Sequence, residues 1–141
     1  MSVREAVHLD MDFIIHHGRR FYEYGPWADV TEFSENNLRA SLSQMIESPD
    51  ACIFVNDHGI CGGLIFPLYF NHSYRIAQEL FWWADEGGEA LREAFEDWAH
   101  GKGAHQIQMT CLADEHEPGM RRLLRAKGYA PFEVSLLKEV H

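Results

Sequence analysis

The chain has 141 residues, 46% of them hydrophobic, and its 22 acidic and 12 basic side chains give a formal net charge of -10. This length and composition exclude a disordered chain and predict one domain over residues 1–141. Acidic surfaces repel phosphate backbones and anionic lipids, so we expect no nucleic-acid binding and no membrane binding. The chain lacks a bilayer-length apolar run and a signal-peptide core, which together predict a cytoplasmic protein.

The N-terminal part of the chain predicts one strand and two helices. Ser2–Val7 alternates apolar and polar residues, as a strand does. Asp10 is a typical helix cap, and the helix that follows it should extend to about Tyr24. Ser34 begins a second helix, in which apolar residues recur at helical spacing.

A hairpin and a central strand follow. Ala51–Val55 and Ile60–Phe70 form the hairpin, because Asn56-Asp57-His58-Gly59 between them is a good turn sequence. Gly62-Gly63 inside the second strand indicates a bulge or a close backbone approach. Ala77–Ala84 is apolar on both faces, which is typical of a central strand.

The C-terminal part predicts the helix Glu89–His100, the strand His105–Leu112, a short helix that ends at Gly128, and a last strand, Tyr129–Val140. The strand–helix–strand unit implies a parallel pair, whereas the hairpins imply antiparallel pairs. We therefore expect an α/β fold, with helices on both faces of a mixed sheet.

The segment from Glu79 to Leu91 passes from a strand through a glycine turn into a helix. Free backbone N–H groups and the helix dipole make such a turn suitable for binding a diphosphate, which glycine allows to approach closely. Glycine pairs also simply begin helices, so the segment alone leaves both readings open.

Several motifs together resemble those of the Gcn5-related N-acetyltransferase (GNAT) superfamily. The opening VREA, the hairpin from Val55 to Gly63, the strand Glu79–Ala84, the segment from Ala94 to Ala104 and Leu124-Arg-Ala-Lys-Gly-Tyr129 carry the resemblance, which covers nearly the whole chain. The pattern also resembles small GNAT-like proteins of tailed phages. The resemblance implies a single-domain GNAT fold, with a mixed central sheet of about six or seven strands and about four flanking helices.

The resemblance also implies a reaction and its groups. Acetyl-CoA, or coenzyme A, would be the cofactor, and a primary amine of a protein or small molecule would accept the acetyl group. Glu79 would be the catalytic base, although a structural glutamate in a salt bridge is the alternative. The family often has a proton-donating tyrosine that this chain lacks. Tyr129 or Cys111 would take its place, and Tyr129 is the catalytic candidate. The cofactor-binding candidates are Phe81, Trp82, Trp83, Ala84, Gly87, Gly88, Glu89 and Ala90.

Two departures from the family pattern keep a second function open. The loop Glu86-Gly87-Gly88-Glu89-Ala90 is short and carries acidic residues in place of a basic one, and carboxylates repel a diphosphate. Leu124 stands where the family often has a proton-donating tyrosine. A GNAT-shaped protein that docks on a partner protein is therefore the alternative to an enzyme. A homodimer is also compatible with the resemblance, because terminal strands of this family often pair across subunits.

Metal and disulfide chemistry are not expected. The spacing of the nine histidines matches no zinc pattern. Cys52, Cys61 and Cys111 stand in apolar, strand-like stretches and are expected to be reduced, buried thiols.

Overall fold

The structure is a computed structural model that describes residues 2–141. It divides into two compact units, Met1–Thr110 and Cys111–His141, and each is described by itself. The first unit contains a five-stranded sheet with helices, and the second contains one α-helix and the C-terminal segment. The expected α/β fold class is confirmed, with five strands among the described residues rather than about six or seven.

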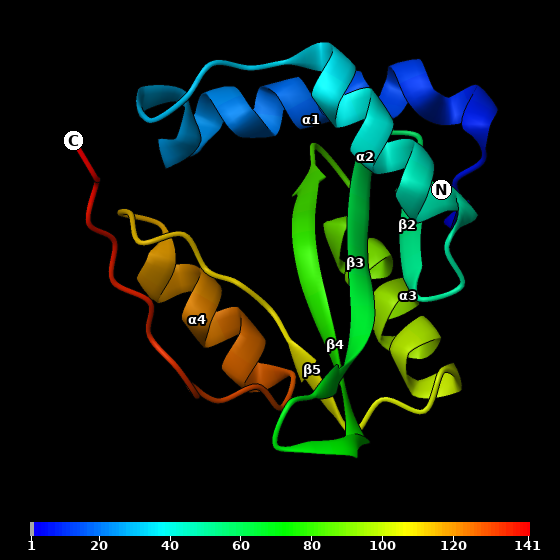
Figure 1. Cartoon of the computed structure of the whole chain (residues 1–141), viewed down its shortest axis with the longest axis vertical. Coiled ribbons are helices and arrows are strands. Elements are labelled where there is room, and N and C mark those ends of the chain that lie inside the picture. Colours follow the sequence, from blue (N-terminus) through cyan, green and yellow to red (C-terminus); the bar gives the residue numbers. More distant parts are fainter. Residues whose placement is uncertain (1) are drawn as a thin grey trace. The chain divides into compact units, whose positions relative to one another are not determined.

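The sheet of the first unit is mixed and keeps its strands in sequence order. Its strands are β1 (Arg4–Glu5), β2 (Ala51–Asn56), β3 (Gly59–Leu68), β4 (Asn71–Ala84) and β5 (Gln106–Gln108). The first four pair antiparallel, and β4 pairs parallel with β5 (Figure 1). The predicted hairpin is confirmed, since Asn56 pairs with Gly59 across its turn.

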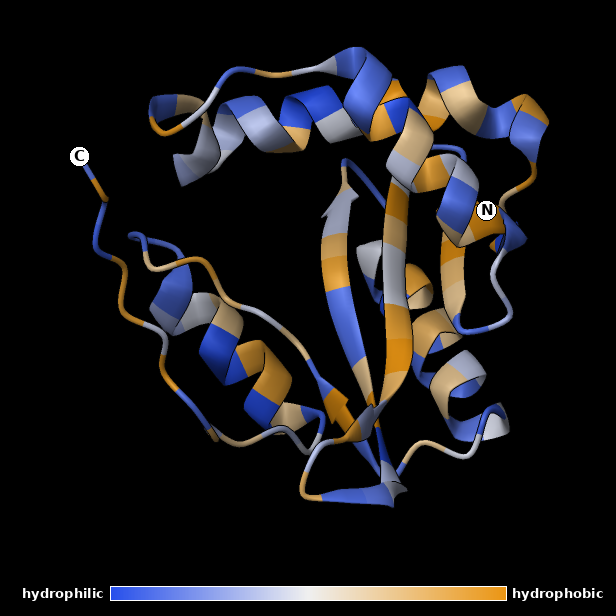
Figure 2. Ribbon diagram, in the orientation of Figure 1, coloured by the Kyte–Doolittle hydropathy of each residue, from blue (hydrophilic) through white to orange (hydrophobic). Residues whose placement is uncertain are grey.

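Helices cover both faces of this sheet. They are α1 (Met11–Tyr24), α2 (Glu35–Glu47) and α3 (Gly88–Gly101), with 3-10 turns at His8–Asp10 and Pro26–Asp29. One apolar cluster joins α1 and α2 to the sheet, and the other joins α3 to it. Figure 2 shows the apolar residues gathered along β2 and β3. The two helix layers bury the sheet, which is what stabilises it.

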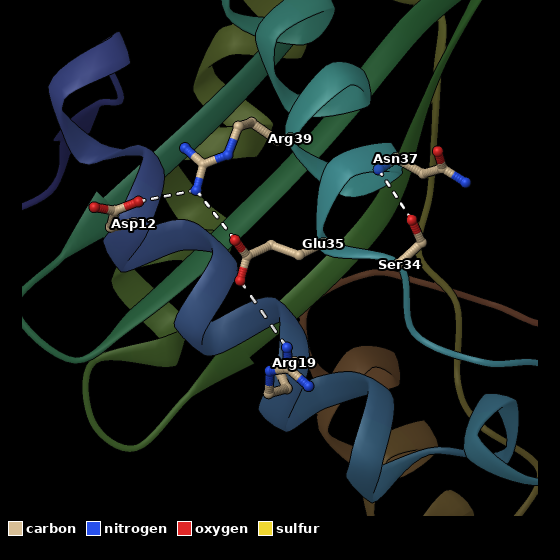
Figure 3. Close-up of polar contacts among 6 residues, drawn as sticks. All are labelled: Asp12, Arg19, Ser34, Glu35, Asn37 and Arg39. Carbon is tan, nitrogen blue, oxygen red and sulfur yellow. Dashed lines mark hydrogen bonds and ion pairs between the residues drawn. The ribbon is translucent and has the colours of Figure 1, made fainter.

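Polar contacts connect α1 with α2 on their outer side (Figure 3). Arg39 donates to Asp12 over 3.1 Å and lies 3.5 Å from Glu35, whose carboxylate is 4.0 Å from Arg19. Ser34 accepts from the backbone N–H of residue 37 over 3.2 Å, and so caps α2 as predicted. Asp10 precedes α1 as expected, but its carboxylate binds Arg4 and the N–H of residue 7 instead of capping that helix.

A β-bulge interrupts the pairing of β3 with β4. Gly62 is opposite Phe81 and Gly63 is opposite Glu79, so Leu80 is the extra residue. An extra residue shifts the alternation of side chains from that point onward. Phe81 consequently packs toward α1, opposite to the face of Glu79, which confirms the predicted irregularity at the glycine pair.

The second unit contains α4 (Glu117–Ala126), which ends as predicted at Gly128 with a φ of 95°. The predicted strand Tyr129–Val140 is wrong, because this segment forms no strand in the structure. Its apolar side chains alternate as in a strand, yet they are 71–96% exposed at Phe132, Val134, Leu136, Leu137 and Val140. Alternation of apolar and polar residues indicates a tendency to form a strand, but a strand also needs a hydrogen-bonded neighbour.

Candidate functional site

The candidate site begins where β4 and β5 separate. Their parallel pairing ends at Gln78 and Gln108, whereas β4 continues to Ala84. Figure 1 shows β5 diverging from β4. Beyond Gln78, this edge of β4 has no strand partner among the described residues. Its backbone N–H and C=O groups are therefore available to a ligand that lies along the strand.

Glu79 lies at this separation point. Its side chain is 5% exposed, and its carboxylate accepts a hydrogen bond of 3.0 Å from the backbone N–H of Thr110. Burial raises the pKa of Glu79 to about 7, and the Thr110 hydrogen bond opposes that rise. The alternative expectation was a strand-edge glutamate in a salt bridge, but Glu79 is buried and has no ion pair among the described residues. The buried carboxyl can instead exchange a proton near neutral pH.

The aromatic residues after Glu79 contribute their side chains to the two cores. Phe81 and Trp83 pack against the cluster of α1 and α2, whereas Trp82 and Ala84 pack against that of α3. These predicted cofactor-binding residues thus leave mainly their backbone to a ligand. Trp82 has a further role, because its indole N–H donates over 2.8 Å to the carbonyl of Gly88.

The predicted glycine turn leads from β4 into α3. Gly87 has a φ of 70° and a ψ of 24°, a left-handed conformation that favours glycine. Helix α3 begins at Gly88, and Leu91 makes the first backbone hydrogen bond back to Gly87. The amides of Gly87, Gly88, Glu89 and Ala90 precede that bond, as is usual for the first turn of a helix. This turn has the backbone form of an anion site.

Each carboxylate around the turn has a basic partner. Asp85 makes two hydrogen bonds with Arg20 of α1, 2.6 and 2.9 Å long. Glu86 lies 3.8 Å from the His58 ring, and Glu89 lies 3.0 Å from the Arg92 guanidinium. The guanidinium groups of Arg20 and Arg92 offset part of this negative charge, whereas His58 does so only when it is protonated. The expected repulsion of a diphosphate by the loop carboxylates therefore stays a prediction. Arg20 and His58 were not predicted from the sequence, because only the fold brings them to the loop. Arg92 was missed although it follows Glu89 at the i,i+3 spacing of helical ion pairs.

Aromatic residues of α1 lie beside the end of β4. The Phe21 and Tyr24 rings are centred 6.1 and 5.1 Å from that of Trp83. Arg20 lies over the same indole at 5.6 Å. The aromatic segment that starts at Phe21 therefore packs on the strand, and Tyr24 and Trp27 remain about half exposed.

The proton-donor candidates belong to the second unit. Tyr129 is half-buried, and its backbone N–H donates to the carbonyl of Leu124 over 3.0 Å. Leu124 is buried in α4. Cys111 is half-buried as well. Glu79 and Tyr129 thus stand in separately described units.

The expectations about metals and thiols concern the rest of the chain. Residues 2–141 contain no group of three or more side chains that could hold a metal ion, and none of their helices is long and apolar enough to cross a membrane. Cys52 and Cys61 are buried free thiols, and burial raises the pKa of Cys52 to about 12.

Known proteins resemble this chain in their structures, but none was matched by sequence. No family model and no curated protein matches the sequence. Glucosamine-6-phosphate N-acetyltransferase of Arabidopsis thaliana is 9% identical, with a TM-score of 0.71 over 99% of this chain and 98% of that chain. AAC(6')-Iy, solved with the bisubstrate analogue CoA-S-monomethyl-acetylneamine, is 12% identical, with a TM-score of 0.74 over 99% and 97%. A transcriptional regulator of Bacillus halodurans C-125 is 15% identical, with a TM-score of 0.75 over 99% of both chains. Identities this low show a shared fold.

Proposed function

The chain has the fold of the GNAT superfamily, and on that premise we propose that it transfers an acetyl group from acetyl-CoA to a primary amine. One observation carries the proposal: a buried carboxyl with a pKa of about 7, Glu79, lies where β4 and β5 separate. A general base works best when its pKa is near the working pH.

Coenzyme A would use the backbone more than the side chains. Its diphosphate would bind the N–H groups of Gly87, Gly88, Glu89 and Ala90 at the start of α3. Its pantetheine arm would extend the sheet along Phe81, Trp82, Trp83 and Ala84, whose outer edge has no strand partner among the described residues. The ion pairs of Asp85 and Glu89 support this placement, because they offset the negative charge of the loop.

The chemistry requires one base, one acid and donors for an oxyanion. Glu79 would take a proton from the substrate ammonium, directly or through water, and so free the lone pair of the nitrogen. That nitrogen would form a bond to the thioester carbon, and backbone N–H groups of β4 would stabilise the oxyanion. The carbon–sulfur bond would then break, and Tyr129 would protonate the leaving thiolate. The nitrogen would lose its second proton to solvent, and solvent would reprotonate Tyr129. The amide and free coenzyme A are the products.

The acceptor is a primary amine of a protein or of a small molecule. A net charge of -10 favours a cationic acceptor through long-range attraction. Tyr24 and Trp27, which are half exposed near the end of α1, would line the acceptor side. Aromatic faces suit an ammonium group, which they attract through cation–π contact.

Calorimetry followed by a thiol-release assay tests the proposal. Acetyl-CoA should bind with micromolar affinity, and an amine panel should contain acceptors that release free coenzyme A. Glu79→Gln should keep acetyl-CoA binding and lose most of kcat, because glutamine can still accept from Thr110 but cannot act as the base. A Glu79→Gln variant with the parent kcat would remove Glu79 from the reaction.

A binding protein without catalysis is the second candidate. The favouring observation is the C-terminal segment 129–141, whose five large apolar side chains are exposed without a strand partner. Exposed apolar patches of this kind often mark protein contacts. Absence of acetyl-CoA binding at millimolar concentration would favour this candidate over the enzyme.

A further inference from the structure

We propose that Asn56, the last residue of β2 before its turn into β3, is the positioning residue that holds the glycine loop in its anion-binding form. The inference rests on the proposed acetyl-CoA function and goes further, because it assigns a role to a residue outside the loop. Asn56 is 6% exposed. Its side-chain N–H₂ group donates to the carbonyls of Glu86 and Gly87, over 3.3 and 3.2 Å.

These two bonds fix the direction of the next two amides. In a trans peptide, the C=O and N–H of one unit point in opposite directions, and no described peptide bond is cis. The carbonyls of Glu86 and Gly87 belong to the same peptide units as the N–H groups of Gly87 and Gly88. Because Asn56 holds both carbonyls toward itself, both N–H groups point away from it.

Trp82 extends the same arrangement by one residue. Its indole N–H holds the carbonyl of Gly88, so the N–H of Glu89 points away from the indole. Three successive amides are therefore oriented by side chains that bind the opposite ends of their peptide units. Gly87 is exposed, so the outward side of its unit is accessible to a ligand. Amides that are already oriented bind an anion without the entropic cost of ordering a loop.

Asn56 is itself held in place by its own turn. Its side-chain oxygen accepts from the backbone N–H of His58 over 2.8 Å, and the carbonyl of His58 accepts from the N–H of Asp85 over 3.0 Å. The side-chain amide of Asn56 therefore makes hydrogen bonds through both its oxygen and its N–H₂ group. Together these bonds fix the rotamer that places the N–H₂ group beside the loop. One buried side chain links the β2–β3 turn to the glycine loop, 30 residues later in the chain.

Two substitutions of Asn56 distinguish the loss of its donor bonds to the loop from the loss of its acceptor bond in the turn. Asn56→Asp keeps the acceptor for His58 and loses both donor bonds, and Asn56→Ala loses both functions. Each should raise the Kd of acetyl-CoA by about tenfold, as expected for the loss of one or two hydrogen bonds. S-acetylpantetheine lacks the diphosphate, so its kcat/KM should change by less than about twofold, since nothing it contacts has been altered.

Asn71 provides the matched control. Its side-chain oxygen likewise accepts from the backbone N–H two residues later, that of Ser73, over 3.0 Å, but Asn71 is the first residue of β4 after its turn from β3. Asn71→Asp and Asn71→Ala should leave the Kd of acetyl-CoA unchanged. Thermal unfolding of all four variants confirms that each one is folded.

The outcomes distinguish the inference from the function on which it rests. If the parent protein binds no acetyl-CoA, the proposed function fails. If the parent binds it and the Asn56 variants bind equally well, Asn56 has no positioning role. Equal losses with acetyl-CoA and S-acetylpantetheine would also overturn the inference, because they would show a general effect on the fold.

Discussion

Arg20 of α1 and Asp85 after β4 form a two-point ion pair, with N–O distances of 2.6 and 2.9 Å. The pair connects a helix on one face of the sheet to the loop that we propose binds a diphosphate. Arg20 lowers the pKa of Asp85 through this hydrogen bond, so the carboxylate stays ionised to a more acidic pH than an unpaired aspartate would. The ion pair thereby engages the Arg20 guanidinium, which could otherwise face the ligand.

Substitution of either partner should change acetyl-CoA affinity in opposite directions. Arg20→Ala leaves an uncompensated carboxylate beside the loop and should raise the Kd. Asp85→Asn leaves an uncompensated guanidinium and should lower it. Both effects should be about two- to fivefold, because the pair is half exposed, and both should shrink in high salt. Calorimetry at low and high salt measures them.

Arg39→Ala is the control for this prediction. Arg39 of α2 pairs with Asp12 of α1, the helix that also carries Arg20 (Figure 3). Its loss should leave the Kd unchanged. An equal rise of the Kd in Arg39→Ala and Arg20→Ala would mean that net charge alone, rather than the position of the pair, determines affinity.

The pH dependence of the reaction should report Glu79. The base acts only when ionised, and its pKa is about 7. Consequently kcat/KM should rise about tenfold per pH unit below pH 7 and level off above it. A profile measured from pH 5 to 9 checks this. A flat kcat/KM profile across pH 7, for an acceptor whose own pKa lies elsewhere, would exclude Glu79 as the base.

Stability should fall with pH over the same range. The folded-state pKa of Glu79 is raised from 4.5 to about 7, so the folded protein binds more protons than the unfolded chain between these values. The free energy of unfolding should therefore decrease as pH rises from about 4.5 to 7. Relative to Glu79→Gln, the parent should lose on the order of 2–3 kcal/mol between pH 5 and 8. Urea unfolding of both proteins at the two pH values tests the difference.

Gly63 should tolerate no side chain. A Cβ atom there would lie 2.4 Å from the backbone oxygen of Gln78 and 2.6 Å from the Phe95 ring. Backbone cannot move aside cheaply, so Gly63→Ala should destabilise the protein by about 1–3 kcal/mol. Gly101→Ala is the matched control, because no atom outside its chain neighbours and the backbone of its own helix lies within 4 Å of its added Cβ. Chemical unfolding should separate the two variants, and equal stability would contradict the tight packing at the bulge.

Tyr129→Phe tests the proposed acid. Loss of the hydroxyl should lower kcat by about a hundredfold, a size typical of general acid catalysis, without changing the Kd of acetyl-CoA. Tyr69→Phe provides a comparison, because Tyr69 is 78% exposed in the β3–β4 turn. An unchanged kcat for Tyr129→Phe would show that the leaving thiolate takes no proton from Tyr129.

Local sequence patterns predicted most elements, because their signals are local. The Ser34 cap, the Asn56–Gly59 turn and the glycine at the start of α3 depend on neighbouring residues, and the structure contains all three. The bulge was indicated by Gly62-Gly63, but its extra residue, Leu80, lies on the partner strand and follows only from the register.

The contacts that could not be predicted are long-range. Asn56 is a turn residue by sequence, yet its donors reach a loop 30 residues away. Arg20 and Asp85 form an ion pair although they lie 65 residues apart in the chain, and no spacing rule detects such a pair. The strand expected at Tyr129–Val140 failed for a related reason, since alternation is local but the pairing of a strand requires a distant partner.

Amide chemical shifts during a coenzyme A titration test the central claim most directly. Coenzyme A should shift the ¹⁵N–¹H signals of Gly87, Gly88 and Glu89 most, together with those of residues 81–84 along β4. S-acetylpantetheine should shift the β4 signals and leave those of the glycine loop in place. Coenzyme A binding that leaves Gly87 and Gly88 unshifted would contradict a diphosphate site at the start of α3.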